Sequence, residues 1–84
     1  MLLAGVKLST RDAQKLAAML TAAGLVTTAD TLARAWGEGD RVVALSFAER
    51  DEILSVLGDP PAGLCELRAV LVEQLVWRRR EGLL

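Results

Sequence analysis

One pattern of residues occurs twice in this chain, 37 positions apart, as LSTRDAQKLAAML over residues 8–20 and LSFAERDEILSVL over residues 45–57. In both copies a Ser is followed three residues later by an acidic residue, which is the capping-box signature of a helix start. These pairs are Ser9 with Asp12 and Ser46 with Glu49. Apolar residues then recur at helical spacing. The repeat predicts two capped amphipathic helices, each with an apolar stripe that must be buried.

The first helix is expected over about residues 10–23. Gly24 is expected to end it, because glycine adopts the left-handed conformation that follows many helix ends. Thr27 and Asp30 repeat the capping signature, so a short second helix is expected to begin there. The polar run GEGD at residues 37–40 ends this helix and predicts a loop.

The third helix follows Ser46 and is expected to end at Gly58. Asp59 is a suitable N-cap for a fourth helix, with Pro60–Pro61 in its first turn, where a missing backbone N–H costs nothing. This fourth helix is expected to run to about Arg80 and is the longest of the four.

The predicted fold is all-α, a compact four-helix domain over residues 1–84 made of two helical hairpins packed face to face. Segments 4–8 and 41–45 precede the repeated helices, and they are either extended lead-ins or very short strands that pair as a two-stranded ribbon. The repeat is either a duplication, with tandem units at about 6–37 and 43–80, or convergence of two capped helices.

Composition argues against catalysis. The chain has no His and no Tyr, so the commonest general base and a common phenolic acid are missing. One thiol, Cys65, cannot form a zinc site, and its apolar neighbours predict a buried side chain. Asp51 and Glu52 are adjacent and are expected on a solvated helix face. We therefore expect no enzyme activity, no cofactor and no metal.

Charge and hydropathy limit the partners. The net charge of −1 gives no overall attraction to nucleic acid or to an anionic membrane. The longest uncharged run, residues 16–29, is shorter than the roughly 20 residues of a membrane-spanning helix. We expect a cytoplasmic protein, and eight Arg against two Lys together with abundant Ala suggest a bacterial source.

The fourth helix has an unusually wide apolar face. At about 100° per residue, its apolar residues fill an arc of about 200°, twice that of an ordinary surface helix. These residues are Leu64, Cys65, Leu67, Ala69, Leu71, Val72, Leu75 and Val76. Such a helix is central to the fold or lies in an oligomer interface, and the candidates for this role are Leu64, Arg68, Leu71 and Leu75. Arg68 falls within the arc and must reach a carboxylate or water.

A second candidate contact surface lies on the polar side of the same helix. Val70 and Trp77 are seven residues apart in one row, and Arg78, Arg79 and Arg80 follow them. Trp and Arg are enriched at interface hot spots, so these five residues are candidates for contact with a partner. Two alternatives remain: Trp77 is ordinary core, or the arginines only complement the helix dipole.

The composition and the fourth helix together favour a non-enzymatic protein–protein interaction module that acts as a regulator or adaptor. The expected partners are a second copy, as a homodimer, and an unidentified protein. An alternative is a DNA-binding helix-turn-helix regulator or antitoxin, with residues 16–34 as the motif. Its second helix has one basic residue, with Asp30 near its start, which disfavours base reading.

Overall fold

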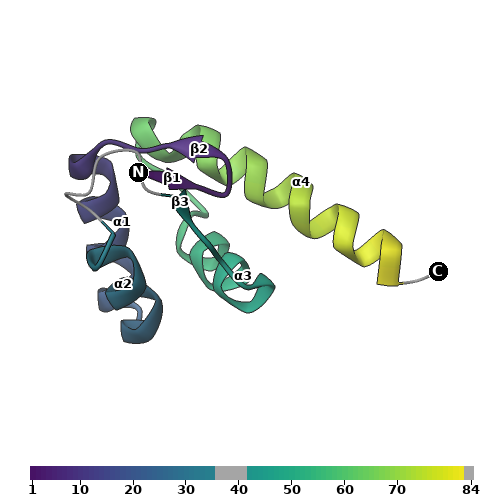
Figure 1. The fold of residues 1–84 in the computed structure, drawn as a ribbon, viewed down its shortest axis with the longest axis horizontal. Helices are drawn as coiled ribbons and strands as arrows, with labels where there is room; N and C mark the ends of the chain where they lie inside the picture. The colour runs from purple at the N-terminus through teal and green to yellow at the C-terminus, as the bar shows by residue number, and fades with distance from the viewer. Residues whose placement is uncertain (36–41, 83–84) are drawn as a thin grey trace.

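The computed structural model describes residues 1–35 and 42–82, and for residues 79–82 it describes the backbone only. Within these residues the chain is mostly helical, with a small sheet (Figure 1). The elements in chain order are β1 (Leu2–Leu3), β2 (Val6–Lys7), α1 (Thr10–Ala22), α2 (Val26–Ala33), β3 (Val42–Val43), α3 (Phe47–Val56), the 3-10 helix η1 (Ala62–Leu64) and α4 (Cys65–Gly82). The expected loop at residues 37–40 lies outside the described residues.

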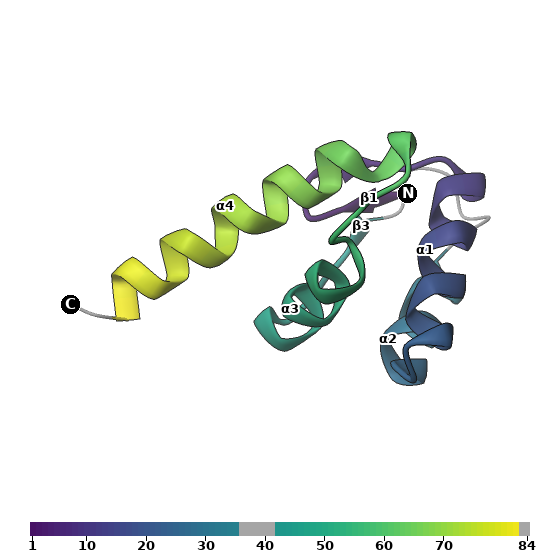
Figure 2. The ribbon, with the colours of Figure 1, turned by 180° about the vertical axis from the view of Figure 1, so that it is seen from behind.

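The helices pack in pairs along the chain. α1 packs on α2, α3 packs on α4, and α1 also contacts α3. α1 and α2 lie together at one end of the molecule, and the C-terminal half of α4 projects from the other end (Figures 1 and 2). The molecule is accordingly elongated, with extents of 40 × 26 × 24 Å.

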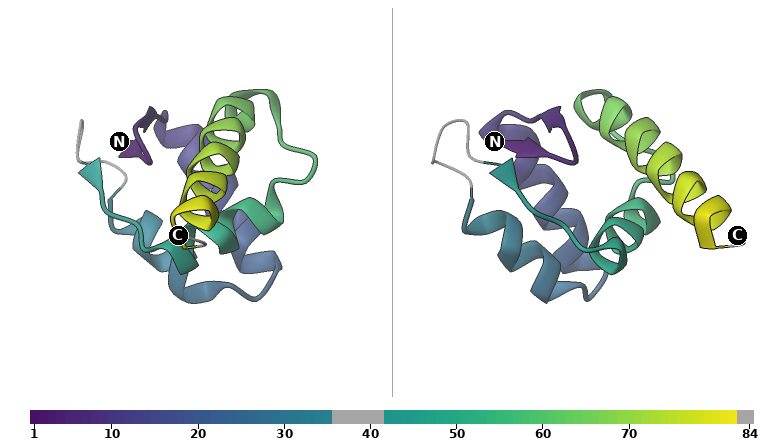
Figure 3. Two further views of the ribbon diagram at one scale, coloured as in Figure 1. Left: turned by 90° about the vertical axis from the view of Figure 1, so that its right-hand side faces the viewer. Right: turned by 45° about the vertical axis from the view of Figure 1, so that its right-hand side comes forward.

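The expectation of a purely helical domain needs correction, because the described residues include a three-stranded sheet in the order β2-β1-β3. β1 pairs antiparallel with β2 and parallel with β3. Segments 4–8 and 41–45 therefore contain strands, but these strands do not pair with each other as a ribbon, because β1 lies between them (Figure 3).

A two-residue turn, which the sequence reading missed, places β1 in the centre of this sheet. Ala4 and Gly5 have φ angles of 52° and 84°, the left-handed conformation of tight hairpin turns. The turn folds β1 back on β2. It thereby places Leu3, which is fully buried, at the centre of the core.

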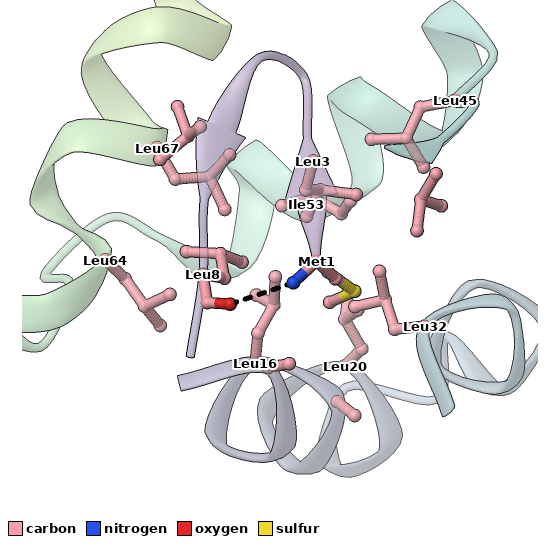
Figure 4. Close-up of a cluster of buried hydrophobic side chains, with 14 of the residues drawn as sticks. Met1, Leu3, Leu8, Leu16, Leu20, Leu32, Leu45, Ile53, Leu64 and Leu67 are labelled. Carbon is pink, nitrogen blue, oxygen red and sulfur yellow. Dashed lines mark hydrogen bonds between the residues drawn. The ribbon is translucent and has the colours of Figure 1, made fainter. Parts of the chain in front are cut away.

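The core is a single apolar cluster to which all the elements contribute. Its buried residues are Met1, Leu3, Val6, Leu8, Ala13, Leu16, Ala17, Leu20, Ala29, Leu32, Ala35, Val43, Leu45, Ile53, Leu57, Leu64, Leu67 and Leu71. Leu16 and Leu20 of α1 and Leu32 of α2 lie beneath β1, and Leu67 of α4 lies beside β2 (Figure 4). The Met1 nitrogen donates a hydrogen bond to the Leu8 carbonyl oxygen at 3.2 Å, which extends the hairpin by one residue pair.

The repeated pattern occupies equivalent places in α1 and α3. Leu16 and Ile53 are both fully buried, and Ser9 and Ser46 each cap the following helix through the side-chain oxygen. The capping box is complete only in α3, where Glu49 also accepts a hydrogen bond from the Ser46 backbone N–H. Whether the repeat reflects duplication stays a prediction.

In α1, by contrast, the side chain of Asp12 does not complete the expected box within the described residues. Its carboxylate lies instead against Gly63 in η1, so close that a Cβ added there would stand 2.5 Å from the Asp12 Oδ1 atom. Aspartate is also one methylene shorter than glutamate. The expected capping box in the first helix was therefore half right.

Two other helix starts differ from expectation. Gly24 ends α1 with a φ of 82°, as expected, but α2 then begins at Val26 with Leu25 as N-cap, so Thr27 lies inside the helix. The left-handed turn leads directly into the next helix and leaves no extended residue at Thr27. Similarly, Pro60–Pro61 precede η1 rather than opening α4.

Two burial expectations were also wrong. Cys65 is exposed, because it lies on the side of α4 that faces away from the core. Glu52 is half-buried and accepts a hydrogen bond from the hydroxyl group of the buried Thr28, so it joins α3 to α2 rather than lying on a solvated face. Asp51 is exposed, as expected.

Candidate functional site

The residues expected at the centre of α4 divide between its two sides. Leu64 and Leu71 are fully buried in the core. Leu75 is half-buried, and Arg68 is exposed, which satisfies its need for water. The apolar arc of α4 is therefore a core face plus a second face directed to solvent.

The candidate partner contacts also divide. Val70 is partly buried and packs against the core. Trp77 has 56% of its surface exposed, so it is not an ordinary core residue. Arg78 is exposed as well, while the side chains of Arg79 and Arg80 lie outside the described part of the chain.

A hollow of about 360 Å³ lies between the first turns of α3 and the later turns of α4. It is lined by Phe47, Arg50, Gln74, Trp77 and Arg78. α3 supplies Phe47 and Arg50 at i, i+3 spacing, which places them on one side of the helix. α4 supplies the other three within one turn and a half. Two of the five, Trp77 and Arg78, are among the candidates drawn from the sequence.

The Phe47 ring is the centre of the hollow. The guanidinium carbon of Arg78 lies 4.2 Å from the ring centroid, and that of Arg50 lies 4.8 Å from it. The electrons of the π face attract both cations. Arg78 is exposed, so its N–H groups can reach other acceptors. Phe47 itself is 37% exposed. The hollow is thus cationic and aromatic.

Gln74 joins the hollow to the sheet. Its side-chain nitrogen Nε2 donates a hydrogen bond of 3.3 Å to the backbone oxygen of Ala4 in the hairpin turn. Its oxygen Oε1, together with Nε of Arg50, is buried with no hydrogen-bond partner in the described part of the chain. A buried acceptor and a buried donor thus remain unsatisfied beside the same hollow, at a cost in free energy for each.

No model of a known protein family, no curated protein and no solved structure matches this chain.

The sequence reading missed Phe47, Arg50 and Gln74. Nothing in the periodicity of the two helices relates residues 47 and 50 to residues 74–78. The only signal in the sequence was the coincidence of one aromatic and two arginines on helices expected to pack together.

The expected helix-turn-helix motif presents little that suits DNA. α2 has Val26, Thr27 and Asp30 exposed on its first turns. Asp30 forms an ion pair of 3.0 Å with Arg34, so the basic residue of this helix faces its own carboxylate. A groove of about 370 Å³ between α1 and α2 is lined by four alanines together with Gln14, Thr21, Val26 and Asp30, and so has no basic residue in its lining.

The described residues contain no group of three or more Cys, Asp, Glu or His side chains placed to hold a metal ion. In the same part of the chain, no helix combines the length and the hydropathy that crossing a membrane requires.

Proposed function

We propose that this protein is a non-enzymatic protein–protein interaction module, acting as a regulator or adaptor, that binds an acidic segment of another protein in the hollow between α3 and α4. The observation that carries the proposal is the pair of arginines stacked on Phe47 beside an exposed tryptophan. The absence of His and Tyr from the sequence is the reason to propose binding without catalysis.

The chemistry of the hollow favours a carboxylate-bearing segment. Guanidinium groups bind carboxylates through two parallel hydrogen bonds, and such charge-assisted bonds are stronger than neutral ones. Arg50 and Arg78 contact the same ring and offer two guanidinium groups, so they suit two acidic side chains, or an acidic side chain and a chain terminus. Trp77 offers an apolar surface beside them for a large apolar residue of the partner.

The two unsatisfied atoms of the hollow support a peptide as the occupant. An extended peptide carries both a backbone N–H donor and a carbonyl acceptor at each residue. With small side-chain shifts, it would donate to Oε1 of Gln74 and accept from Nε of Arg50. A phosphate group, the other acidic ligand that suits arginine, offers acceptors only and would leave the Gln74 oxygen unpaired.

Selection from a random peptide library on phage tests this proposal without knowledge of the natural partner. We expect the enriched peptides to share Asp or Glu residues and one large apolar residue. The best peptide is then synthesised and titrated by tryptophan fluorescence in a Trp36→Phe background, so that Trp77 is the only reporter.

Two variants that each remove one arginine charge, one inside the hollow and one outside it, test whether the peptide binds in the hollow. Replacing Arg78 by Gln should weaken binding of this peptide about tenfold or more, because a hydrogen bond to a charged group contributes about 1.5–3 kcal/mol. Arg34→Gln removes the same charge from α2, outside the hollow, and should leave the affinity unchanged. Equal effects of the two variants, or enriched peptides without acidic residues, would contradict the proposal. Competition by inorganic phosphate or duplex DNA at matched charge would point to a phosphate-bearing ligand instead.

A further inference from the structure

The side of α4 that faces away from the core has an apolar stripe exposed to solvent. Its members are Cys65, Ala69, Val72 and Val76, which follow one another at spacings of four, three and four residues. All four are exposed, with Val72 at 37% and Val76 at 43%. At a rise of about 1.5 Å per residue the stripe is about 16 Å long. Its spacing is that of a coiled-coil seam, the pattern by which one helix packs along another.

This outer stripe points away from the rest of the molecule. At about 100° per residue its centre lies about 150° around the helix from the centre of the core-facing residues Leu67 and Leu71. If α4 of a second copy packs along the stripe, the body of each molecule therefore lies on the side of its own α4 that is away from the contact. The shape of the monomer leaves room for such a helix, because α4 is the outermost element on its side (Figure 3).

The charges that flank the stripe are of opposite sign. Arg68 lies about 70° to one side of its centre and Glu73 about 70° to the other. Both are exposed, and neither forms an ion pair within the described residues. They lie too far apart around the helix to pair with each other. One flank of the stripe is thus basic and the other acidic.

We propose that the outer stripe binds a second copy of this chain, with the two α4 helices parallel and in register. In a parallel helix pair, a residue on one flank contacts the residue five positions later on the opposite flank of its neighbour. Arg68 of each copy then meets Glu73 of the other, which gives two symmetric ion pairs. The two-fold axis lies along the stripe, and the interface is closed, because the same surface serves both copies.

The flanking charges also exclude an antiparallel arrangement of the two α4 helices. An antiparallel pair centred on the stripe would place Glu66 of one copy near Glu73 of the other, twice. Two like-charge contacts replace two attractive ones, and such contacts at the edge of a helix pair set orientation. The second copy is therefore parallel.

Solution mass tests the interface directly. Sedimentation velocity over protein concentrations of about 10 μM to 1 mM should show a monomer converting to a dimer, because a seam this short supports only modest affinity. The double variant Val72→Gln, Val76→Gln should remain monomeric at the same concentrations. Val26→Gln, which changes an exposed valine on α2 (60% exposed), is the control and should dimerise as the wild type does.

Charge reversal tests the register. Arg68→Glu and Glu73→Arg should each weaken dimerisation about tenfold, because two exposed ion pairs become two repulsions. Mixing these two single variants should restore association as a heterodimer, since each 68–73 contact then joins opposite charges. If either charge acted only within its own chain, mixing the two variants would not restore association.

Cys65 reports the orientation. In the parallel pair the two Cys65 thiols face each other at one end of the seam, so diamide should take up their two hydrogen atoms and leave a disulfide-linked dimer. In an antiparallel pair the two thiols lie at opposite ends of the seam, and no cross-link forms. A wild-type monomer at every concentration would overturn the proposal, as would dimerisation that Val72→Gln, Val76→Gln leaves unchanged or a mixture of the charge variants that fails to associate. The parallel register would also be overturned by a dimer that does not cross-link.

Discussion

Truncation of Leu71 measures how far the fold depends on α4. Leu71 is fully buried, whereas the next residue, Val72, lies about 100° further around the helix and is 37% exposed. Replacing a buried leucine by alanine removes its packing and leaves a cavity, at a cost of about 2–5 kcal/mol. Domains have a net stability of about 0.05–0.15 kcal/mol per residue, or about 4–13 kcal/mol for 84 residues. Leu71→Ala should therefore remove a large fraction of the total stability.

Urea unfolding followed by circular dichroism gives the free energy of unfolding of each variant. Val72→Ala is the control and should change it by less than about 0.5 kcal/mol, because the side chain is exposed. Leu71→Asp should not fold, since an isolated buried carboxylate costs more than the domain can offset. Leu75→Ala should fall between the two alanine variants, because Leu75 is half-buried. A loss below about 1 kcal/mol for Leu71→Ala, or a folded Leu71→Asp, would show that α4 is not the central helix.

Two further predictions concern the repeat and the hairpin. Glu49→Ala should lower the free energy of unfolding by about 1 kcal/mol, because it breaks a complete capping box. Asp12→Ala at the equivalent position should cost less, because no such reciprocal bond is lost. Equal losses in urea unfolding would show that the two helix starts are alike. Ala4→Gly should raise the midpoint of thermal unfolding by a few degrees, because alanine in the left-handed region costs about 1–2 kcal/mol. The extra freedom of glycine in the unfolded chain offsets part of this gain. Ala4→Val should lower the midpoint, and a higher midpoint for Ala4→Val than for Ala4→Gly would refute the strained turn.

Helix starts and ends that depend on a few adjacent residues could be predicted from the sequence. Ser46 with Glu49 located the start of α3, and Gly24 located the end of α1, because capping and left-handed turns depend on a few adjacent residues. A capping pair predicted the wrong helix start where the preceding turn determined the start instead. Thr27 and Asp30 match the signature, but the turn after Gly24 leads into α2 before Thr27 is reached.

The three-stranded sheet could not be predicted from the periodicity of apolar residues. Strands of two residues, such as β1 and β3, contain too few positions to show an alternating pattern. Their pairing is decided by the buried Leu3 and by the turn at Ala4 and Gly5. The pairing of β1 with β3 also joins residues about 40 positions apart, which no local signal encodes.

The wide apolar arc of α4 shows what such patterns leave undecided. Hydropathy counts apolar residues around a helix but does not say what covers them, so Leu71 and Val72 contributed alike to one face of about 200°. In the structure Leu71 faces the core, and Val72, about 100° further around the helix, faces solvent. The hollow, around Trp77 and Arg78, occupies a third side. Because self-association and partner binding are proposed for different sides of one helix, Val72→Gln, Val76→Gln should leave peptide binding intact and Arg78→Gln should leave the dimer intact. Either proposal can therefore fail without the other.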